Sequence, residues 1–281
     1  MKQKPPRNDY RTPEQIREHY EVEKELASRL RNASKQERRF LYSSLYDELY
    51  RRVPFHPQIT RKMSSVESKQ AVSHQMEFLG PFLSKDITFL ELGPGDCALS
   101  FEVAKLVKQV YAVYVSDEIT KATTAPANFQ LILSDGSSVP IPPNSVNVAY
   151  SNMLIEHLHP ADAIEQLISI YNALIPGGVY ICITPNRITG PHDVSKYFDV
   201  AAMGFHLKEY TTLELCNLFR KAGFSRVGFY IGVRGKYLRL HIFPIAMVEM
   251  IIDKLLYILR RTIAPNLSFT LLPGIRLVGV K

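Results

Sequence analysis

The residues with the clearest chemical potential lie in one short segment in the first half of the chain. Glu91 is followed by Gly93, Pro94 and Gly95, and mainly apolar residues surround the acid over 88–92. Glycine permits backbone angles, and a close approach of a ligand, that a Cβ atom would block. A buried strand that turns through glycines into a helix is a common cradle for nucleotides in α/β proteins. The segment therefore predicts a bound nucleoside cofactor, with Glu91 facing inward.

The pattern around this segment predicts the elements that must position it. From residue 87 short apolar runs alternate with helical patterns, which is typical of repeated βαβ units and a parallel sheet. Helices are expected over about 65–79, 163–174 and 211–222. The expected strands span 88–92, 109–115, 129–133, 146–151, 178–184, 225–232 and 275–280.

Two capping signals predict helices before this region. Thr12 and Ser34 each precede a Gln or Glu by three residues, a pairing that satisfies free N–H groups at a helix start. The second helix is expected to end before Pro54 and to carry its apolar residues on one side, namely Phe40, Leu41, Leu45, Tyr46 and Leu49. We assign residues 1–62 to a helical N-terminal extension and 63–281 to the main domain.

Four motifs follow one another along the main domain. They are Phe-Leu-Glu-Leu-Gly-Pro-Gly at 89–95, Ser-Asp-Gly at 134–136, Ser-Val-Asn-Val-Ala-Tyr-Ser-Asn-Met-Leu-Ile-Glu-His-Leu at 145–158, and Leu-Ile-Pro-Gly-Gly-Val-Tyr with Thr-Pro-Asn within 174–186. In this order the motifs resemble those of class I, Rossmann-like S-adenosylmethionine-dependent methyltransferases of the small-molecule type. The resemblance implies an α/β fold with a seven-stranded, mostly parallel sheet, helices on both faces, and S-adenosylmethionine as cofactor.

The resemblance also implies which residues hold the cofactor. Glu91 and the turn at 93–95 would line its methionine and ribose side, while Asp135 would accept the adenine amino group. Carboxylates suit these roles because they accept hydrogen bonds from amines and hydroxyls and tolerate a sulfonium. For Glu91 and Asp135 the alternative is an exposed turn or cap residue. The implied cofactor residues are Glu91, Gly93, Pro94, Gly95, Tyr114, Asp117, Asp135, Gly136, Ser151 and Asn152.

Two positions depart from the family pattern. The second strand of the family normally ends in an acid that binds both ribose hydroxyls, and Tyr114 occupies that position here. A phenol has one oxygen and cannot replace a bidentate carboxylate, so Asp117 or Glu118 would have to reach in from the following loop, or cofactor affinity would be lower. Cys97 stands at the family's usual third glycine, where a small buried residue is the expected role.

Methyl transfer mainly requires alignment of the acceptor behind the methyl group, and a base is needed only for a weak nucleophile such as a hydroxyl. Candidates follow the fourth and fifth strands, where ligands collect in such sheets. We predict His192 as the base, oriented by Asp193, with His157 as a further candidate. The alternatives are that residues 191–193 fix a turn and cap the next segment, and that His157 packs beside the cofactor at a helix start.

The segment 243–261 is strongly apolar, with Glu249, Asp253 and Arg260 as a thin polar stripe. Its interior charges argue against a membrane-spanning helix. We expect a helical insertion at about 234–273 in the terminal hairpin, acting as a cap over the acceptor, a dimer surface or a peripheral membrane contact.

Charge and cysteine usage limit the function classes. The net charge of +7 divides into about +6 for 1–62, −5 for the middle and +6 for 234–281. Basic ends suit an anionic surface or solvated helix faces, and no aromatic-interleaved basic motif indicates nucleic acid. The cysteines at 97, 182 and 216 have no paired or metal-ligand spacing, and the start is polar. We expect a cytoplasmic protein with no metal, in at most peripheral contact with a membrane.

The sequence thus predicts methyl transfer to a small or lipid-linked acceptor, with oxygen as the favoured atom. One alternative is a non-catalytic cofactor sensor or scaffold that recruits a membrane or partner. A methyltransferase for nucleic acid or protein is another, although the Asn/Asp-Pro-Pro-Tyr/Phe motif of amino-base enzymes is missing. A dinucleotide oxidoreductase is disfavoured because Ala98 replaces the later glycine of its motif.

Overall fold

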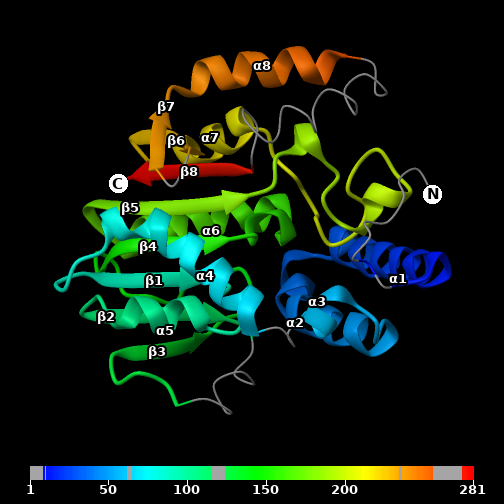
Figure 1. The fold of residues 1–281 in the computed structure, drawn as a ribbon, viewed down its shortest axis with the longest axis horizontal. Helices are drawn as coiled ribbons and strands as arrows, with labels where there is room; N and C mark the ends of the chain where they lie inside the picture. The colour runs from blue at the N-terminus through cyan, green and yellow to red at the C-terminus, as the bar shows by residue number, and fades with distance from the viewer. Residues whose placement is uncertain (1–8, 10, 62–64, 116–123, 234–235, 256–273) are drawn as a thin grey trace.

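The computed structural model describes residues 9, 11–61, 65–115, 124–233, 236–255 and 274–281. It contains one twisted sheet with strand order β3-β2-β1-β4-β5-β8-β6-β7 (Figure 1). The first five strands in this order are parallel, whereas β8 runs antiparallel to both β5 and β6. The strands are β1 (Thr88–Leu92), β2 (Gln109–Tyr114), β3 (Phe129–Leu133), β4 (Val146–Asn152), β5 (Leu174–Thr184), β6 (Arg226–Val233), β7 (Lys236–Leu240) and β8 (Ile275–Val280). The predicted α/β class and mostly parallel sheet are confirmed.

The prediction of seven strands is wrong by one. Residues 236–240, which we placed in the helical insertion, form β7 and pair antiparallel with β6. This strand lies at the edge of the sheet and carries Lys236 and Arg239, and charges of this kind are common on edge strands because they discourage pairing with another chain.

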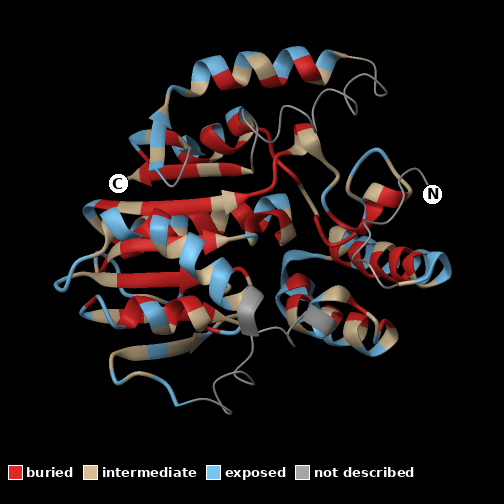
Figure 2. Ribbon diagram, in the orientation of Figure 1, coloured by how far each residue is buried: buried red, intermediate tan, exposed pale blue. Residues whose placement is uncertain are grey.

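Helices cover both faces of the sheet because alternate side chains of each strand point to opposite sides. On one face, Phe89 and Tyr150 pack with α4 and α5, and on the other Leu90 and Tyr180 pack with α6 and α7. Figure 2 shows the buried residues concentrated in the central strands and on the inner sides of these helices. The helices are α4 (Ser65–Leu79), α5 (Ala98–Ala104), α6 (Pro160–Ala173) and α7 (Thr212–Lys221).

The N-terminal helices α1 (Pro13–Asn32), α2 (Lys35–Arg52) and α3 (Pro57–Arg61) lie beyond the carboxyl ends of the parallel strands (Figure 1). Both predicted capping boxes are present, at Thr12 and Ser34. Of the apolar side predicted for α2, Leu45 and Leu49 are buried together with Tyr42, whereas Phe40 is 76% exposed.

A buried ion pair attaches α2 to the main domain. The Arg38 guanidinium donates from Nε and Nη2 to the two oxygens of Asp162 in α6, at 2.7 and 2.6 Å. The Tyr42 hydroxyl donates to the same carboxylate and accepts from the backbone N–H of His159. Three donors therefore share one buried acid, which fixes α2 against the start of α6.

The last helix, α8 (Ile242–Lys254), packs against the domain with Glu249 and with the apolar residues Ile245 and Ile252. Glu249 is buried and accepts hydrogen bonds from the Asn186 amide and from Thr212 at the start of α7. Its apolar residues Phe243, Met250 and Ile251 are exposed. Residues 256–261 of the predicted 243–261 helix, including Arg260, lie outside the described residues. Within the described ranges, every helix is too short or too polar to cross a bilayer.

Candidate functional site

The turn after β1 has the backbone conformation that its glycines predict. Gly93 and Gly95 have φ angles of +68° and +56°, which favour glycine, and Pro94 between them is buried. A Cβ at Gly93 would lie 3.1 Å from the Leu154 Cδ1 atom, so the position is restricted by space as well as by conformation. Cys97 adopts φ +60° directly before α5, which explains why a glycine would suit this position.

Glu91 is buried on β1 at the base of this turn, so the alternative of an exposed turn residue is wrong for it. The Ser100 hydroxyl of α5 donates to Glu91 Oε2 at 2.5 Å. Burial raises the pKa of Glu91 to about 7, with Asp96 adding to the shift and the Ser100 hydrogen bond opposing it. No cation is paired with this acid in the described part of the chain, so a positively charged ligand would stabilise its ionised form.

Asp135 holds the turn after β3. Its Oδ1 atom accepts the backbone N–H groups of Ser137 and Ser138 at 3.0 and 2.7 Å, and Oδ2 pairs with Arg39 of α2 at 3.2 Å. These hydrogen bonds lower the pKa of Asp135, against the effect of its partial burial. The alternative role as a turn residue is therefore confirmed, and contact with an adenine stays a prediction. At Gly136, φ is +87° and a Cβ would meet Tyr42 of α2 at 2.8 Å.

The remaining predicted cofactor residues lie along the same carboxyl edge. Tyr114 ends β2 and is half-buried, and Asn152 ends β4 in a similar setting. Ser151 is buried, and its hydroxyl is hydrogen-bonded to that of Tyr180 at 2.7 Å. This hydrogen bond joins β4 to β5. Asp117 lies outside the described residues.

A cavity of about 590 Å³ lies between the N-terminal helices and the loop that follows β5. Five of the eight histidines of the chain line it, together with the acids Glu23 and Asp193. The structure therefore brings the predicted residues His157, His192 and Asp193 to one cavity. The lining histidines are His19, His56, His157, His192 and His206.

The prediction that Asp193 orients His192 is wrong. Asp193 Oδ1 accepts the Ser195 N–H and caps the short 3-10 helix Val194–Tyr197, while Oδ2 accepts the Gly204 N–H. The alternative role of this segment, a turn that caps the next element, is confirmed. His192 is held differently, because its Nε2 atom lies 3.0 Å from the backbone carbonyl oxygen of Asn186. A carbonyl oxygen can only accept, so Nε2 carries the proton and Nδ1 keeps its lone pair.

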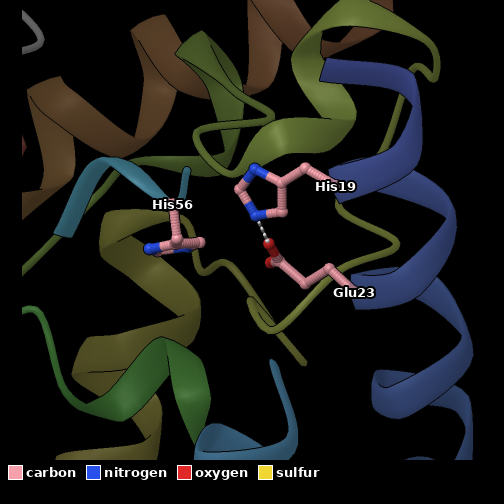
Figure 3. A group of neighbouring side chains, drawn as sticks. All are labelled: His19, Glu23 and His56. Atoms are coloured by element: carbon pink, nitrogen blue, oxygen red, sulfur yellow. Dashed lines mark hydrogen bonds and ion pairs between the residues drawn. The ribbon is translucent and has the colours of Figure 1, made fainter. Parts of the chain in front are cut away.

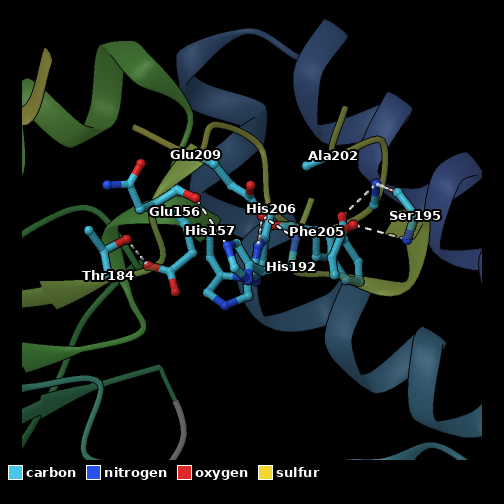
Figure 4. A network of polar contacts seen from close by, with 12 residues as sticks. Glu156, His157, Thr184, His192, Ser195, Ala202, Phe205, His206 and Glu209 are labelled. Atoms are coloured by element: carbon cyan, nitrogen blue, oxygen red, sulfur yellow. Dashed lines mark hydrogen bonds and ion pairs between the residues drawn. The ribbon is translucent and has the colours of Figure 1, made fainter. Parts of the chain in front are cut away.

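Next to His192, a second group surrounds His157 (Figure 4). His157 lies in the 3-10 helix Ile155–His157 directly after β4, and its Nδ1 atom is 3.0 Å from the Phe205 carbonyl oxygen and 2.9 Å from the Tyr46 hydroxyl. Burial, with the neighbouring His206, lowers the pKa of His157 to about 3. His157 is therefore neutral at physiological pH.

Glu156 and His206 complete this group. Glu156 is fully buried and accepts from the Thr184 hydroxyl through Oε2, and burial raises its pKa to about 7. His206 is held by Glu209, whose Oε1 lies 2.7 Å from His206 Nδ1. Burial acts to lower the pKa of His206, but the acids Glu209, Glu156 and Asp193 raise it overall.

The N-terminal helix closes the other side of the cavity. His19 and Glu23, one turn apart on α1, are joined at 2.7 Å, and the ring of His56 packs edge-on against that of His19 (Figure 3). Glu23 also accepts the Phe205 N–H, and Arg31 of α1 donates to the Met203, Gly204 and His206 carbonyls. Helix α1 therefore positions the loop that carries His206.

Comparisons with known proteins agree with the motifs. Residues 90–182 match a family profile described as a methyltransferase domain. A Mycolicibacterium smegmatis protein described as an S-adenosylmethionine-dependent methyltransferase is 31% identical over 138 residues, which cover 48% of this chain and 51% of that protein. Over about half of its length, the chain is therefore similar to an S-adenosylmethionine-dependent methyltransferase, and residues 90–182 match a methyltransferase domain. It spans about half the length of the curated relative that it matches.

Solved structures of methyltransferases share the fold of this chain. The methyltransferase crystallised with the Trm112 activator from Haloferax volcanii is similar with a TM-score of 0.52 and 15% identity, covering 77% of this chain and 94% of that chain. A methyltransferase from Thermotoga maritima gives a TM-score of 0.50 and 15% identity over 79% of this chain and 97% of that chain.

The residues at the turn after β1 fit S-adenosylmethionine. A Cβ at Gly93 would make a tight contact with Leu154, and the buried Glu91 has no cationic partner among the described residues, which an ammonium or sulfonium would supply. When bound, the cofactor supplies an activated methyl group. Glu91 and the backbone at 93–95 would hold its methionine side, and Asn152 lies at the end of the neighbouring strand.

The sequence interpretation missed most of the cavity wall. His19, Glu23 and Tyr46 belong to the extension, to which we had assigned no site residue. The spacing of His19 and Glu23, four residues apart on one side of a predicted helix, was the available signal. Glu156 and His206 were visible in the sequence, but their proximity depends on a contact between the end of β4 and a loop about 50 residues later, which spacing does not indicate.

Proposed function

We propose that this chain transfers a methyl group from S-adenosylmethionine to an oxygen atom of a small or lipid-linked acceptor bound in the histidine-lined cavity. The observation that carries the proposal is the position of this cavity. Its wall includes His157, which directly follows β4, and His192, which lies in the loop after β5; β4 in turn pairs with β1, the strand before the turn that fits the cofactor. Ligands of open α/β sheets bind at this edge.

The oxygen acceptor is supported by the state of His192. A hydroxyl is a weak nucleophile, so it gains from a base that removes its proton as the methyl group arrives. With Nε2 held by the Asn186 carbonyl, His192 offers a free Nδ1 lone pair, and an ordinary imidazole is mostly neutral at pH 7. The proton of the acceptor would go to Nδ1.

A lipid-linked acceptor is supported by the surroundings of Asn186. The same residue that holds His192 donates its side-chain amide to Glu249 of α8 at 2.6 Å. The outer face of α8 exposes Phe243, Met250 and Ile251. An apolar surface therefore lies on the helix that is joined to the proposed base through Asn186. We propose that this face makes peripheral contact with a membrane that carries the acceptor.

The acceptor test uses S-adenosylmethionine labelled in its methyl group. The full chain is incubated with a lipid extract and, separately, with a water-soluble metabolite extract, and label transfer is measured. Transfer to a product with a new O-methyl group is expected in one of them. If label reaches only nitrogen or carbon, the oxygen assignment fails, and if cofactor binds without any transfer, the non-catalytic sensor is favoured.

The base is tested with His192→Ala. We expect turnover to fall by about 100-fold or more while cofactor affinity stays unchanged, because general-base catalysis contributes about that much. His74→Ala is the matched control, since His74 lies on α4 with a side chain that is 76% exposed. Equal turnover in the two variants would remove His192 from the mechanism.

Membrane contact is tested by sedimentation with vesicles that contain anionic lipid. The wild-type chain is expected to sediment with them, and Ile251→Glu, which places a charge on the exposed face, should bind less. Leu238→Glu, at another exposed apolar position, is the control. Concentration-dependent dimer formation that Ile251→Glu abolishes, without vesicle binding, would instead show a dimer surface.

A further inference from the structure

We propose that Glu156, His157 and His206 bind a divalent transition-metal cation at the wall of the cavity. Each of the three side chains offers one ligating atom, and these atoms lie within 4.8 Å of one another. Two of the three residues, His157 and His206, also line the cavity, so a cation held here would face a bound acceptor. Two imidazoles and one carboxylate are a common ligand set for Zn²⁺ and related ions, which leave positions open for another ligand.

The carboxylate of Glu156 provides independent evidence for a bound cation. Glu156 has no exposed surface, and its Oε1 atom has no hydrogen-bond partner in the described part of the chain. Its other oxygen accepts from the Thr184 hydroxyl at 2.9 Å, which fixes the direction of the carboxyl group. A buried carboxylate oxygen without a partner is costly, and a cation removes that cost.

The two imidazoles are oriented as metal ligands usually are. His206 Nδ1 faces the Glu209 carboxylate at 2.7 Å, and His157 Nδ1 faces the Phe205 carbonyl at 3.0 Å (Figure 4). Both partners accept hydrogen bonds, so Nδ1 carries the proton in each ring and the Nε2 lone pair is left for a metal. A metal-bound histidine typically donates its other N–H to a carboxylate or a backbone carbonyl.

A second group of two histidines and one glutamate lines the same cavity but has no atoms left to bind a metal. His19, Glu23 and His56 are also close together, but their atoms are already engaged. His19 accepts from the Arg11 guanidinium at Nδ1 and contacts Glu23 at Nε2, and both oxygens of Glu23 accept hydrogen bonds. His56 Nδ1 accepts the Gln58 N–H, so its proton lies on Nε2. This group is a closed hydrogen-bond chain and serves as the internal control.

The bound cation would act as a Lewis acid. An acceptor hydroxyl on an open coordination position would lose its proton more readily, and the proton would pass to His192. This role rests on the proposed methyl transfer, whereas the metal site itself does not. Failure of metal binding would therefore leave the cofactor and His192 tests unaffected.

The experiment titrates Zn²⁺ into the full, untagged chain after treatment with a chelator. Calorimetry is expected to show about one bound Zn²⁺ per chain, and Zn²⁺ should raise the melting temperature because it binds only the folded state. Glu156→Gln should weaken binding by about 100-fold or more, and Glu209→Gln by about 10- to 100-fold through loss of the histidine's partner.

His56→Gln is the control, and it should bind Zn²⁺ like the wild type. Glu209→Gln keeps the test valid if Glu156→Gln does not fold. Absence of Zn²⁺ binding to the wild type would overturn the proposal and favour a charged His206 that pairs with Glu156 without a metal. Unchanged binding in both Glu156→Gln and Glu209→Gln, or loss only in His56→Gln, would place the metal elsewhere and overturn it equally.

Discussion

Two regions at the carboxyl edge of the sheet are built in different ways. The centre of the cofactor side, around Glu91, is a single stretch of chain in which β1, the glycine turn and α5 follow one another directly. The cavity side joins α1, α2, the end of β4 and the loop after β5, which are distant in sequence. Local backbone conformation determines the first region, whereas the docking of separate segments determines the second. Damage to the two regions should therefore have different consequences.

The largest effect is expected from Arg38→Ala, which tests the docking of the N-terminal helices. The substitution leaves Asp162 buried, with only 2% of its side chain exposed, and without its bidentate partner. Removal of one member of a buried ion pair costs about 3–5 kcal/mol in the free energy of unfolding. Urea denaturation of the full chain measures this loss.

The matched control is Lys35→Ala on the same helix. Lys35 pairs with Glu165, also of α6, but the two side chains are 49% and 45% exposed. An exposed pair contributes about 1 kcal/mol or less. If both variants were equally stable, burial of the Arg38 pair would not be what attaches α2 to α6.

Gly93→Ala tests the cofactor side alone. The left-handed conformation costs a residue with a Cβ about 1–2 kcal/mol, and the contact with Leu154 adds to this. We expect cofactor affinity to fall by about tenfold or more, measured by calorimetry, with little change in the cavity. Gly80→Ala is the control, because a Cβ there has no heavy atom within 4 Å. A Gly93 variant that binds as tightly as the Gly80 variant contradicts the role of the turn.

These two regions also show what the sequence could predict. The strands, the capping boxes at Thr12 and Ser34 and the conformations of Gly93 and Gly95 follow from local rules that a short window contains. The cap that Asp193 forms with Ser195 is also local, whereas the burial of Glu249 depends on Asn186 and Thr212, which are distant in sequence, and no spacing encodes that contact. The polar stripe of α8 can be seen in the sequence, but the side that it faces depends on how the helix docks.

Tyr114→Asp tests the position at the end of β2 where this chain has a tyrosine instead of the acid that is usual in the family. A carboxylate at the end of β2 can accept both ribose hydroxyls, and charge-assisted hydrogen bonds contribute about 1.5–3 kcal/mol. We expect binding of S-adenosylmethionine to tighten by about tenfold. Tyr114→Phe, which removes only the hydroxyl, should bind about as the wild type does. A weaker complex for the aspartate variant would mean that the tyrosine contributes contacts of its own.

The smallest expected effect is the change in cofactor affinity with pH. Because burial raises the pKa of Glu91 to about 7, this acid is mostly protonated at pH 6 and mostly ionised at pH 8. A cationic cofactor prefers the ionised form, so affinity should rise with pH, by about tenfold or less over this range. In Glu91→Gln the affinity should be weaker, and this rise should be lost. A wild-type affinity that falls with pH would contradict the assignment.

The most direct test of the account is a crystal structure of the full chain grown with S-adenosylmethionine. We predict that the methionine part lies over the turn at 93–95 beside Glu91, and that the methyl group points toward the cavity lined by His157 and His192. A cofactor bound at another place, or a turn at 93–95 that binds no cofactor at saturating ligand, would contradict it.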